Sequence, residues 1–222
     1  MENPHIRRDW GLSMAIIVSV LVIDQIIKIY VKTHFVLHEA VDVTSWFQLL
    51  FIENKGMAFG MDFVGTLFLT LFRFAAIILF VVLLRNGIRR RLPLGLLCCI
   101  ALIIAGAAGN LIDNSLYGLI FSESTYWQAS EFVPFGQGYG AFLEGKVVDM
   151  FYFPLFTWPD WVPVLGGQVF FNAIFNFADA AISCGAIAVL LFYSRFLFSD
   201  KTDKKAEDEK DAADESSSLH CE

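Results

Sequence analysis

Four long apolar runs constrain this chain of 222 residues more than any other feature of its sequence. They cover about residues 12–31, 66–84, 94–112 and 170–198, and the chain as a whole is 56% hydrophobic. An α-helix rises about 1.5 Å per residue, so each run can cross roughly 30 Å of hydrocarbon. The sequence therefore predicts a membrane α-helical fold with four transmembrane helices.

The basic residues around these runs predict an orientation in the membrane. Arginines and lysines gather at residues 7–8, 85–91 and 195–205, whereas the connections at residues 32–65 and 113–169 are poor in both. An excess of Lys and Arg in short loops favours the cytoplasmic side. Both termini are therefore expected in the cytoplasm, and the two connections poor in basic residues are expected outside it.

The two outer connections differ in character. Residues 34–61 mix β-prone side chains with a turn-like Asn-Lys-Gly at residues 54–56, which predicts a small extracytoplasmic β-sheet on the membrane surface. Residues 115–169 are rich in aromatic residues, Gly and Pro. Because tryptophans favour the membrane–water interface, this interfacial segment is expected to lie along the bilayer.

The C-terminal residues differ in composition from the rest. Residues 200–222 hold nine acidic residues against four lysines, which predicts a solvated, disordered cytoplasmic tail. Residues 1–199 are expected to form a single membrane domain, which no feature of the sequence requires to be more than a monomer.

Polar residues of three runs converge on one depth. A charge within a span costs roughly 2.5 to 3.5 kcal/mol on insertion scales, so a functional role is the default hypothesis for each. In the predicted topology all lie in the outer half of the membrane: Asp24 and Lys28 in the first run, Asn110 and Asp113 at the end of the third, and Asn176 and Asp179 in the fourth. The second run contributes only Arg73, and Asp149, with apolar residues on both sides, can reach the same depth from the third connection.

Each of these residues also has a structural interpretation. Asp24 and Lys28 are four residues apart and can form an ion pair, with the lysine extending toward the outer surface. Asn110 and Asp113 can cap or cross-link helix ends, and Asn176 and Asp179 can form an interhelical hydrogen bond. Against this, two carboxylates in a poorly solvated site share one proton, which is the arrangement of an aspartic protease.

Other chemistries receive less support from the sequence. The four histidines, at positions 5, 34, 38 and 220, all lie outside the apolar runs. This disfavours an intramembrane zinc site or a Ser-His pair. No metal, cofactor or nucleic-acid ligand is expected.

Five short blocks together resemble the lipoprotein signal peptidase family, also called signal peptidase II. They occur in the family's order on the background of four apolar runs: Asp-Gln with a lysine at residues 24–28, Asn-Lys-Gly-Met-Ala-Phe-Gly at 54–60, Gly-Ala-Ala-Gly-Asn-Leu-Ile-Asp at 106–113, Val-Val-Asp at 147–149 and Phe-Asn-Phe-Ala-Asp at 175–179.

The resemblance implies a four-helix enzyme of the bacterial inner membrane, with a small β-cradle and an outer helix over an active site near the outer leaflet. It implies Asp149 and Asp179 as the catalytic pair of an aspartic endopeptidase. The residues implied to order the site and its substrate are Asp24, Lys28, Asn54, Gly56, Gly109, Asn110, Asp113, Asn176 and Ala178. The implied partners are membrane lipid, a prolipoprotein whose cysteine carries diacylglycerol and is cut on its amino side, and globomycin-type peptide inhibitors.

The chain departs from the family pattern in two places. The family usually has an arginine directly after the third-block aspartate, but Asn114 follows Asp113 here, so a salt bridge at that position is absent or supplied from elsewhere. Residues 115–146 are an insertion before Asp149, expected to elaborate the outer lid or the membrane contact.

Two other functions compete with the peptidase. A small proton-coupled transporter also uses intramembrane carboxylates, but it predicts acids distributed across the membrane and, often, internal repeats. A non-enzymatic assembly factor would use the same acids for helix association and would tolerate isosteric changes to them.

Overall fold

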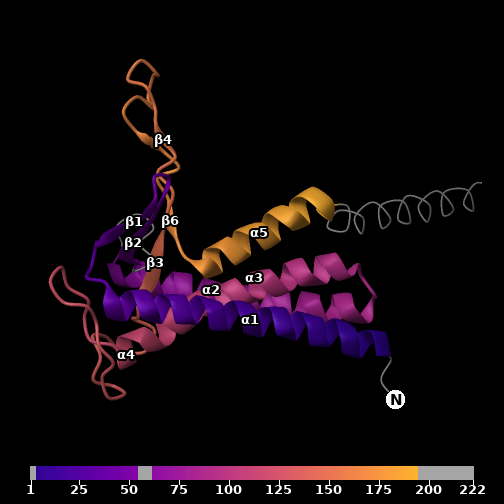
Figure 1. Cartoon of the computed structure of the whole chain (residues 1–222). Coiled ribbons are helices and arrows are strands. Elements are labelled where there is room, and N and C mark those ends of the chain that lie inside the picture. The colour runs from indigo at the N-terminus through magenta and orange to yellow at the C-terminus, as the bar shows by residue number, and fades with distance from the viewer. Residues whose placement is uncertain (1–3, 55–61, 195–222) are drawn as a thin grey trace, which may run out of the picture.

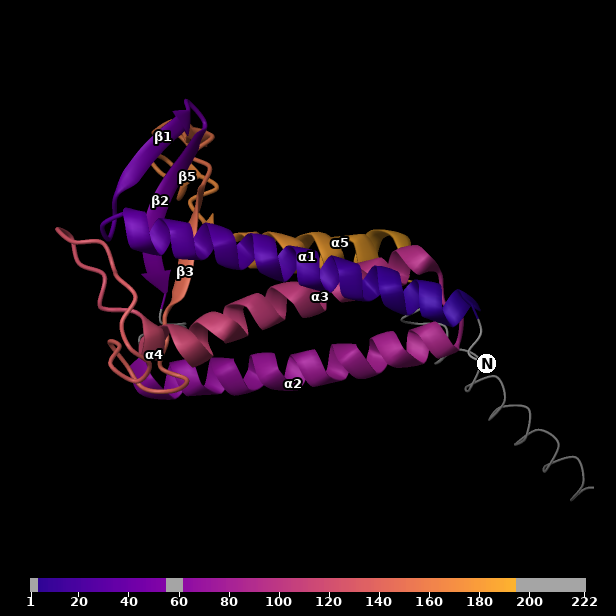
Figure 2. The same ribbon diagram turned by 60° about the horizontal axis from the view of Figure 1, so that its bottom comes forward.

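The structure, a computed structural model, describes residues 4–54 and 62–194 of the chain. Within these residues, the helices α1 (Pro4–His34), α2 (Asp62–Arg89) and α3 (Leu94–Ile112) run side by side (Figures 1 and 2). All three contain apolar stretches long enough to cross a membrane. The first three predicted runs are therefore confirmed as helices, and the third coincides with α3 from its first residue to its last.

The fourth run differs from the prediction at its start. Helix α5 (Phe177–Phe192) has only 16 residues, about 24 Å at 1.5 Å per residue. The run was expected to be helical from residue 170, but β5 (Val169–Phe170) and β6 (Ile174–Phe175) precede the helix. Asn176 is the N-cap of α5 and has an extended backbone conformation, so the helix begins only at the next residue. Residues 195–198 of the run, and the predicted tail, lie outside the described residues.

Helix α3 lies at the centre of the helical part and packs against α1, α2 and α5. Its glycines permit close approach to α5, because a Cβ atom on Gly106 would lie 2.2 Å from the backbone oxygen of Ala178. On α5, a Cβ atom on Gly185 would lie 2.7 Å from the backbone oxygen of Cys99. Small residues at helix crossings are typical of membrane helices, whose association depends on close packing. The start of α5 is thereby fixed against the C-terminal half of α3.

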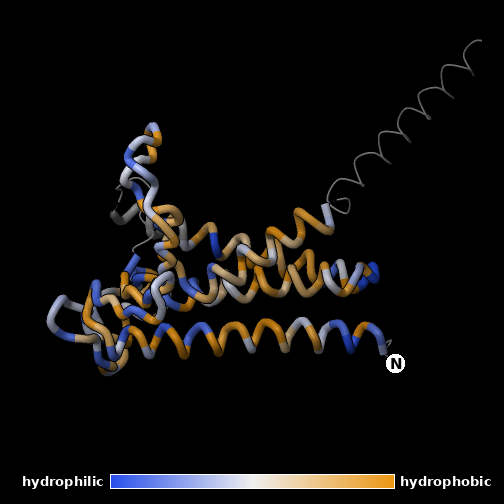
Figure 3. Tube along the Cα trace, turned by 45° about the horizontal axis from the view of Figure 1, so that its top comes forward, coloured by the Kyte–Doolittle hydropathy of each residue, from blue (hydrophilic) through white to orange (hydrophobic). Residues whose placement is uncertain are grey.

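Hydropathy follows this arrangement. Figure 3 shows hydrophobic residues along the middle of the helices and hydrophilic residues toward both ends of the bundle. Many large apolar side chains on α2 face outward, including Phe68, Phe72 and Leu79, which are 69%, 61% and 55% exposed. Such a surface suits a lipid environment rather than water.

A four-stranded antiparallel sheet meets one end of the bundle. Its order is β1 (Ala40–Thr44), β2 (Phe47–Asn54), β3 (Val147–Tyr152) and β6. The predicted small sheet is confirmed for residues 40–54, and the structure adds two strands from later in the chain. The sheet extends across the direction of the helices (Figures 1 and 2). A second sheet pairs β4 (Phe156–Thr157) with β5 at its far tip.

The insertion begins directly at the end of α3. The chain continues as a π-helical turn η1 (Asp113–Tyr117) and the short α4 (Gly118–Ile120). The rest of the insertion folds back onto the end of α1, where the Ser130 backbone amide donates to the Lys32 carbonyl at 3.2 Å. Phe121 is fully buried there. A π-helical turn inside a helix often marks a functional site, and this one lies where the third helix reaches the sheet.

Candidate active site

Asp149 and Asp179 reach one place from different elements. Asp149 lies on β3, in register with Ile52 of β2, and Asp179 lies in the first turn of α5. The amide nitrogen of Asn176 donates to Asp149 Oδ1 at 2.7 Å, and the amide nitrogen of Asn110 donates to Asp179 Oδ1 at 2.7 Å. Asn176 also donates to Asn110 Oδ1 at 3.1 Å. Two side-chain amides thus link the two carboxylates.

The position of Asp179 follows from the local sequence. Asn176 is the N-cap of α5, and its side-chain oxygen accepts from the backbone amide of Asp179 at 2.9 Å. The Asp179 carboxylate accepts in return from the Asn176 backbone amide at 3.4 Å. This reciprocal capping box satisfies backbone donors that a helix start leaves free. It also fixes the carboxylate at the helix N-terminus, where the helix dipole favours a negative charge.

A buried lysine holds the neighbouring acids together. Lys28 Nζ lies 3.0 Å from Asp24 Oδ2, 2.7 Å from Asp113 Oδ2 and 2.8 Å from Asn110 Oδ1. The predicted Asp24–Lys28 ion pair is confirmed, but the outward extension of the lysine is wrong, because Lys28 is fully buried. Three acceptors surround its ammonium group, which compensates for the loss of water around the charge.

Further contacts fix Asp24 at the crossing of three helices. Asp24 Oδ1 accepts from the backbone amide of Ala178 at 2.9 Å. A Cβ atom on Gly109 would lie 2.6 Å from Asp24 Oδ2, so the glycine leaves room for that carboxylate. Gln25 donates to Asp113 Oδ1 at 2.9 Å and accepts from the Tyr117 hydroxyl at 3.1 Å. Sequence reasoning did not single out Tyr117, since nothing in its local pattern indicates a contact with the first helix.

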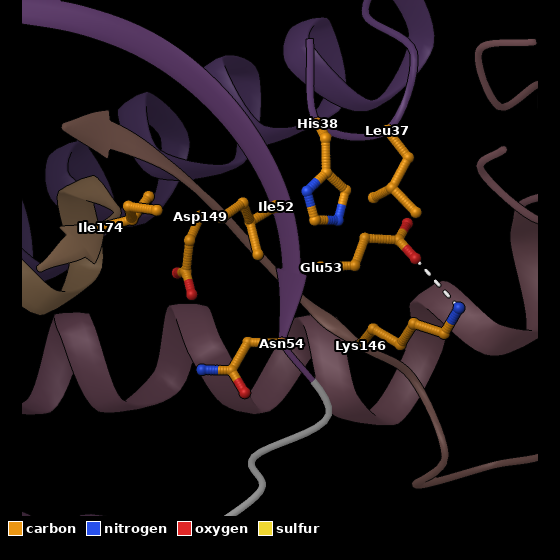
Figure 4. A pocket seen from close by; sticks show the side chains of 8 residues that line it. All are labelled: Leu37, His38, Ile52, Glu53, Asn54, Lys146, Asp149 and Ile174. Carbon is orange, nitrogen blue, oxygen red and sulfur yellow. Dashed lines mark ion pairs between the residues drawn. The ribbon is translucent and has the colours of Figure 1, made fainter. Parts of the chain in front are cut away.

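A pocket of about 420 Å³ opens beside Asp149. Figure 4 shows the Asp149 carboxylate and the Asn54 amide pointing into the same space, and the two side chains are hydrogen-bonded. Gly56, the other predicted residue of that block, lies outside the described residues. The pocket is lined by Leu37, His38, Ile52, Glu53, Asn54, Lys146, Asp149 and Ile174.

The electrostatics of Asp149 suit proton transfer near neutral pH. Burial, and then the negative charge of Asp179, raise the pKa of Asp149 to about 7. Hydrogen bonds from Asn176 and Asn54 and the charge of Lys28 act in the opposite direction. Perturbed carboxyl groups in a pocket are typical of active sites.

Comparison with known proteins decides the family. The family model described as Signal peptidase (SPase) II matches residues 16–196. The chain belongs to the signal peptidase II family. It is 49% identical over 186 residues to a lipoprotein signal peptidase of Porphyromonas gingivalis, with 82% of each chain covered. A lipoprotein signal peptidase of Amoebophilus asiaticus is 34% identical, with 77% of this chain and 72% of that protein covered.

The fold of this signal peptidase II chain also resembles solved structures. Two solved structures, each described as a bacterial membrane enzyme and determined by the in meso method at 1.9 Å and 2.3 Å, superpose with TM-scores of 0.57 and 0.56. They cover 82% and 84% of this chain, and the chain covers 91% and 90% of theirs, at 22% identity. Family and apolar helices together indicate a multi-pass bacterial membrane peptidase that acts in lipoprotein processing.

The structure of this signal peptidase II chain brings the predicted site residues together. Those that lie in one connected set of contacts are Asp24, Lys28, Asn54, Gly109, Asn110, Asp113, Asp149, Asn176, Ala178 and Asp179. The predicted convergence of the polar residues is confirmed as geometry. Their separate chemical roles stay predictions.

A second buried ionic cluster lies at the same pocket. It was not predicted from the sequence. Lys32 forms an ion pair with Glu53 Oε1, which also accepts from the Ser124 hydroxyl at 2.7 Å. Lys146 Nζ lies 3.1 Å from Glu53 Oε2 (Figure 4). Burial acts to raise the pKa of Glu53, but the charge and hydrogen bond of Lys32 and the Ser124 hydroxyl outweigh it, so the pKa is lowered. Only the apolar surroundings of Lys32 could have indicated such a pair.

Proposed function

We propose that this chain is an intramembrane aspartic endopeptidase that removes the signal peptide from diacylglyceryl-modified prolipoproteins. It cuts on the amino side of the lipidated cysteine. Family membership supports the removal of lipoprotein signal peptides. The observation that carries the aspartic mechanism is the pair Asp149 and Asp179, linked by Asn176 and Asn110 beside a pocket.

The two carboxylates have different surroundings, which assigns them different roles. Burial and the negative charge of Asp179 raise the pKa of Asp149, so we place the shared proton on Asp149. Asp179 accepts hydrogen bonds from Asn110 and from a helix N-terminus, both of which stabilise its anion. The pair therefore carries one negative charge, and its two titration steps belong to both residues together.

This distribution of charge permits hydrolysis without a metal or a covalent intermediate. Asp179 takes a proton from a water molecule, whose oxygen attacks the scissile carbonyl carbon. Asp149 donates its proton to the carbonyl oxygen, so the tetrahedral intermediate forms as a neutral gem-diol. Collapse of the intermediate breaks the carbon–nitrogen bond, a proton passes from Asp179 to the leaving nitrogen, and Asp149 recovers its own proton from the second hydroxyl group.

A membrane-bound substrate also needs an apolar surface on the enzyme. An apolar pocket of about 610 Å³ lies between α2, α3 and α5, toward the end of the bundle opposite to the pair, and is lined by residues such as Phe80, Ile100 and Val189. An apolar signal helix needs a surface of this kind, and the diacylglyceryl group keeps the cut site near the bilayer. We assign residues 1–199 to a single domain of four spans, with α5 as the last, both termini cytoplasmic and the pair near the outer leaflet of the inner membrane.

Purified enzyme mixed with a prolipoprotein tests this proposal. The substrate is supplied with and without diacylglycerol on its cysteine, and mass spectrometry locates the cut. We expect one cut, directly before the lipidated cysteine, and inhibition by a globomycin-type peptide. Equal cleavage of the unmodified precursor would contradict the proposed lipid requirement. Proton flux through liposomes that contain the protein, without any cleavage, would favour a transporter instead.

A further inference from the structure

Arg73 is a cation placed inside the apolar helix α2. A charge in such a segment is costly unless it meets a partner. Its neighbours Phe72 and Phe74 are 61% and 54% exposed on the helix surface, whereas Arg73 is half-buried. Its guanidinium Nη1 donates to Asn114 Oδ1 at 2.6 Å. Arg73 therefore turns inward, toward the π-helical turn that follows α3.

Asn114 also contacts Gly145, in the segment that leads into β3. Its side chain is buried, and its amide nitrogen donates to the Gly145 carbonyl at 3.0 Å. The Gly145 backbone amide donates in return to the Asn114 carbonyl at 2.9 Å. A Cβ atom on Gly145 would lie 2.1 Å from the Asp113 carbonyl oxygen, so backbone meets backbone at this point. Arg73 fixes which way the Asn114 amide faces, since an oxygen must point to the guanidinium.

Asp149 lies four residues beyond Gly145, on the strand that this contact begins. Val148, the residue directly before it, also approaches the turn, with its backbone amide 3.5 Å from Asp113 Oδ2. The path from Arg73 through Asn114 and Gly145 thus connects α2 to the strand that carries one catalytic carboxylate. A shift of that strand would change the distance between the two acids.

Arg73 also changes the charge balance of the site, because it lies near enough to attract Asp179, Asp113 and Asp149. The titratable and charged groups that surround the catalytic pair are Asp24 and Lys28 of α1, Arg73 of α2, and Asp113 and Tyr117 of η1, and the pocket beside Asp149 adds His38, Glu53 and Lys146. Glu53 is paired with Lys32 and Lys146. With one proton shared by the pair, the four aspartates carry three negative charges against the two cations Lys28 and Arg73. Without Arg73, Lys28 alone would oppose them.

We propose that Arg73 is a positioning residue of the peptidase site, which orients the Asn114–Gly145 contact beneath Asp149 and supplies the second cation for the four carboxylates. The inference rests on the proposed aspartic peptidase function. It also accounts for Asn114, at the position where the family pattern has an arginine: here the positive charge comes from α2, and the Asn114 side-chain oxygen accepts a hydrogen bond from the Arg73 guanidinium.

The test compares Arg73→Gln, Arg73→Lys and the double variant Arg73→Gln with Asn114→Arg. Arg85→Gln is the matched control, because it makes the same change on an exposed residue of the same helix. Cleavage of the lipid-modified prolipoprotein is measured from pH 5 to pH 9. Hydrogen exchange of residues 143–150 is measured by mass spectrometry on each full-length protein in micelles.

Arg73→Gln is expected to slow cleavage about tenfold to a hundredfold, the size of effect that a small misplacement of a catalytic group produces. Loss of the cation makes each proton of the pair harder to remove, so both limbs of the pH–rate profile move to higher pH. Exchange at residues 145–148 becomes faster. Arg73→Lys keeps both the cation and the Asn114 contact and is expected to keep the wild-type pH–rate profile and exchange. The double variant keeps a cation but loses the amide that donates to Gly145, so it is expected to keep the wild-type pH–rate profile while exchange at residues 145–148 stays fast. Arg85→Gln changes none of these quantities.

Two results would overturn the inference while the wild type still cleaves. One is a wild-type rate and profile for Arg73→Gln. The other is slower cleavage by Arg73→Gln with the pH–rate profile and the hydrogen exchange of the wild type. That result would show that Arg73 acts only through packing. A wild type that does not cleave at all would overturn the proposed function, and the exchange comparison would still decide whether Arg73 holds the Gly145 segment.

Discussion

The side-chain nitrogen of Asn176 lies 2.7 Å from Asp149 Oδ1, while its side-chain oxygen accepts from the backbone amide of Asp179 at 2.9 Å. One residue therefore caps the last helix and ties that helix to the strand of the sheet. Asn176→Ala is expected to lose both interactions. Asn176→Asp is expected to lose only the hydrogen bond donated to Asp149 and to keep the one accepted from the Asp179 amide. We expect both variants to lose most of their activity and only Asn176→Ala to lose the cap, about 1 kcal/mol of unfolding free energy. Chemical denaturation and cleavage rates distinguish these effects, and an active Asn176→Asp enzyme would contradict the account.

The raised pKa of Asp149 predicts how stability depends on pH. The folded chain keeps the Asp149 proton up to about pH 7, whereas the ordinary value for the unfolded aspartate is 3.8. The folded state then binds more protons than the unfolded state between these values, so the unfolding free energy decreases as the pH rises from about 4 to 7. Asp149→Asn cannot lose a proton in this range. Its unfolding free energy at pH 8 is therefore expected to exceed that of the wild type by about 2 to 4 kcal/mol.

Thermal or chemical unfolding at pH 4 and at pH 8 measures this difference. The two proteins are expected to be close in stability at pH 4, where both side chains are neutral. An equal gap at the two pH values would show that Asp149 does not titrate as described.

Glycine at the crossing of α3 and α5 should be necessary for the site. A Cβ atom on Gly106 would lie 2.2 Å from the Ala178 carbonyl oxygen, next to Asp179. Gly106→Ala is expected to push the two helices apart, lower the unfolding free energy by about 1 to 3 kcal/mol and reduce cleavage. Gly11→Ala in α1 is the control, because nothing lies within 4 Å of its Cβ position. That change should leave activity intact and stabilise the helix by up to about 1 kcal/mol.

The buried pair of Lys32 and Glu53 should contribute to stability more than a comparable exposed pair. Glu53→Gln leaves the buried Lys32 ammonium without its counter-charge. We therefore expect the unfolding free energy to decrease by about 3 to 5 kcal/mol. Glu123→Gln is the control, because the Glu123 side chain is 67% exposed and lies 3.4 Å from Lys146. Glu123→Gln should lower the unfolding free energy by less than about 1 kcal/mol. Equal effects in denaturation experiments would show that burial does not determine the strength of the Glu53 pair.

The helices were predictable where composition changes sharply. The third run lies between Pro93 and Asp113, and α3 has the bounds that these residues indicate. The prediction for the fourth run was wrong at its start because residues 169–175 are largely apolar, and hydropathy does not separate a short apolar strand from a helix. The capping pair Asn176 and Asp179, three residues apart, was the available signal for the true start.

The candidate site was predictable as a convergence but not as a set of contacts. Topology and the family blocks brought Asp24, Asp113 and Asp179 to one depth. The pairing of β2 with β3 joins segments about a hundred residues apart, so no local pattern indicates that Asp149 stands opposite Ile52. The same is true of Arg73 and Asn114, whose contact depends on how α2 packs against the end of α3.

The proposed catalytic pair is tested most directly by cleavage of diacylglyceryl-modified prolipoprotein with Asp149→Asn and Asp179→Asn beside the wild type. Each substitution keeps the size of the side chain but removes the ability to share a proton. We expect the wild type to release the signal peptide, and both variants to fold, to bind the substrate and to leave it uncut. Cleavage at the wild-type rate by either folded variant would contradict the assignment of that aspartate to the pair.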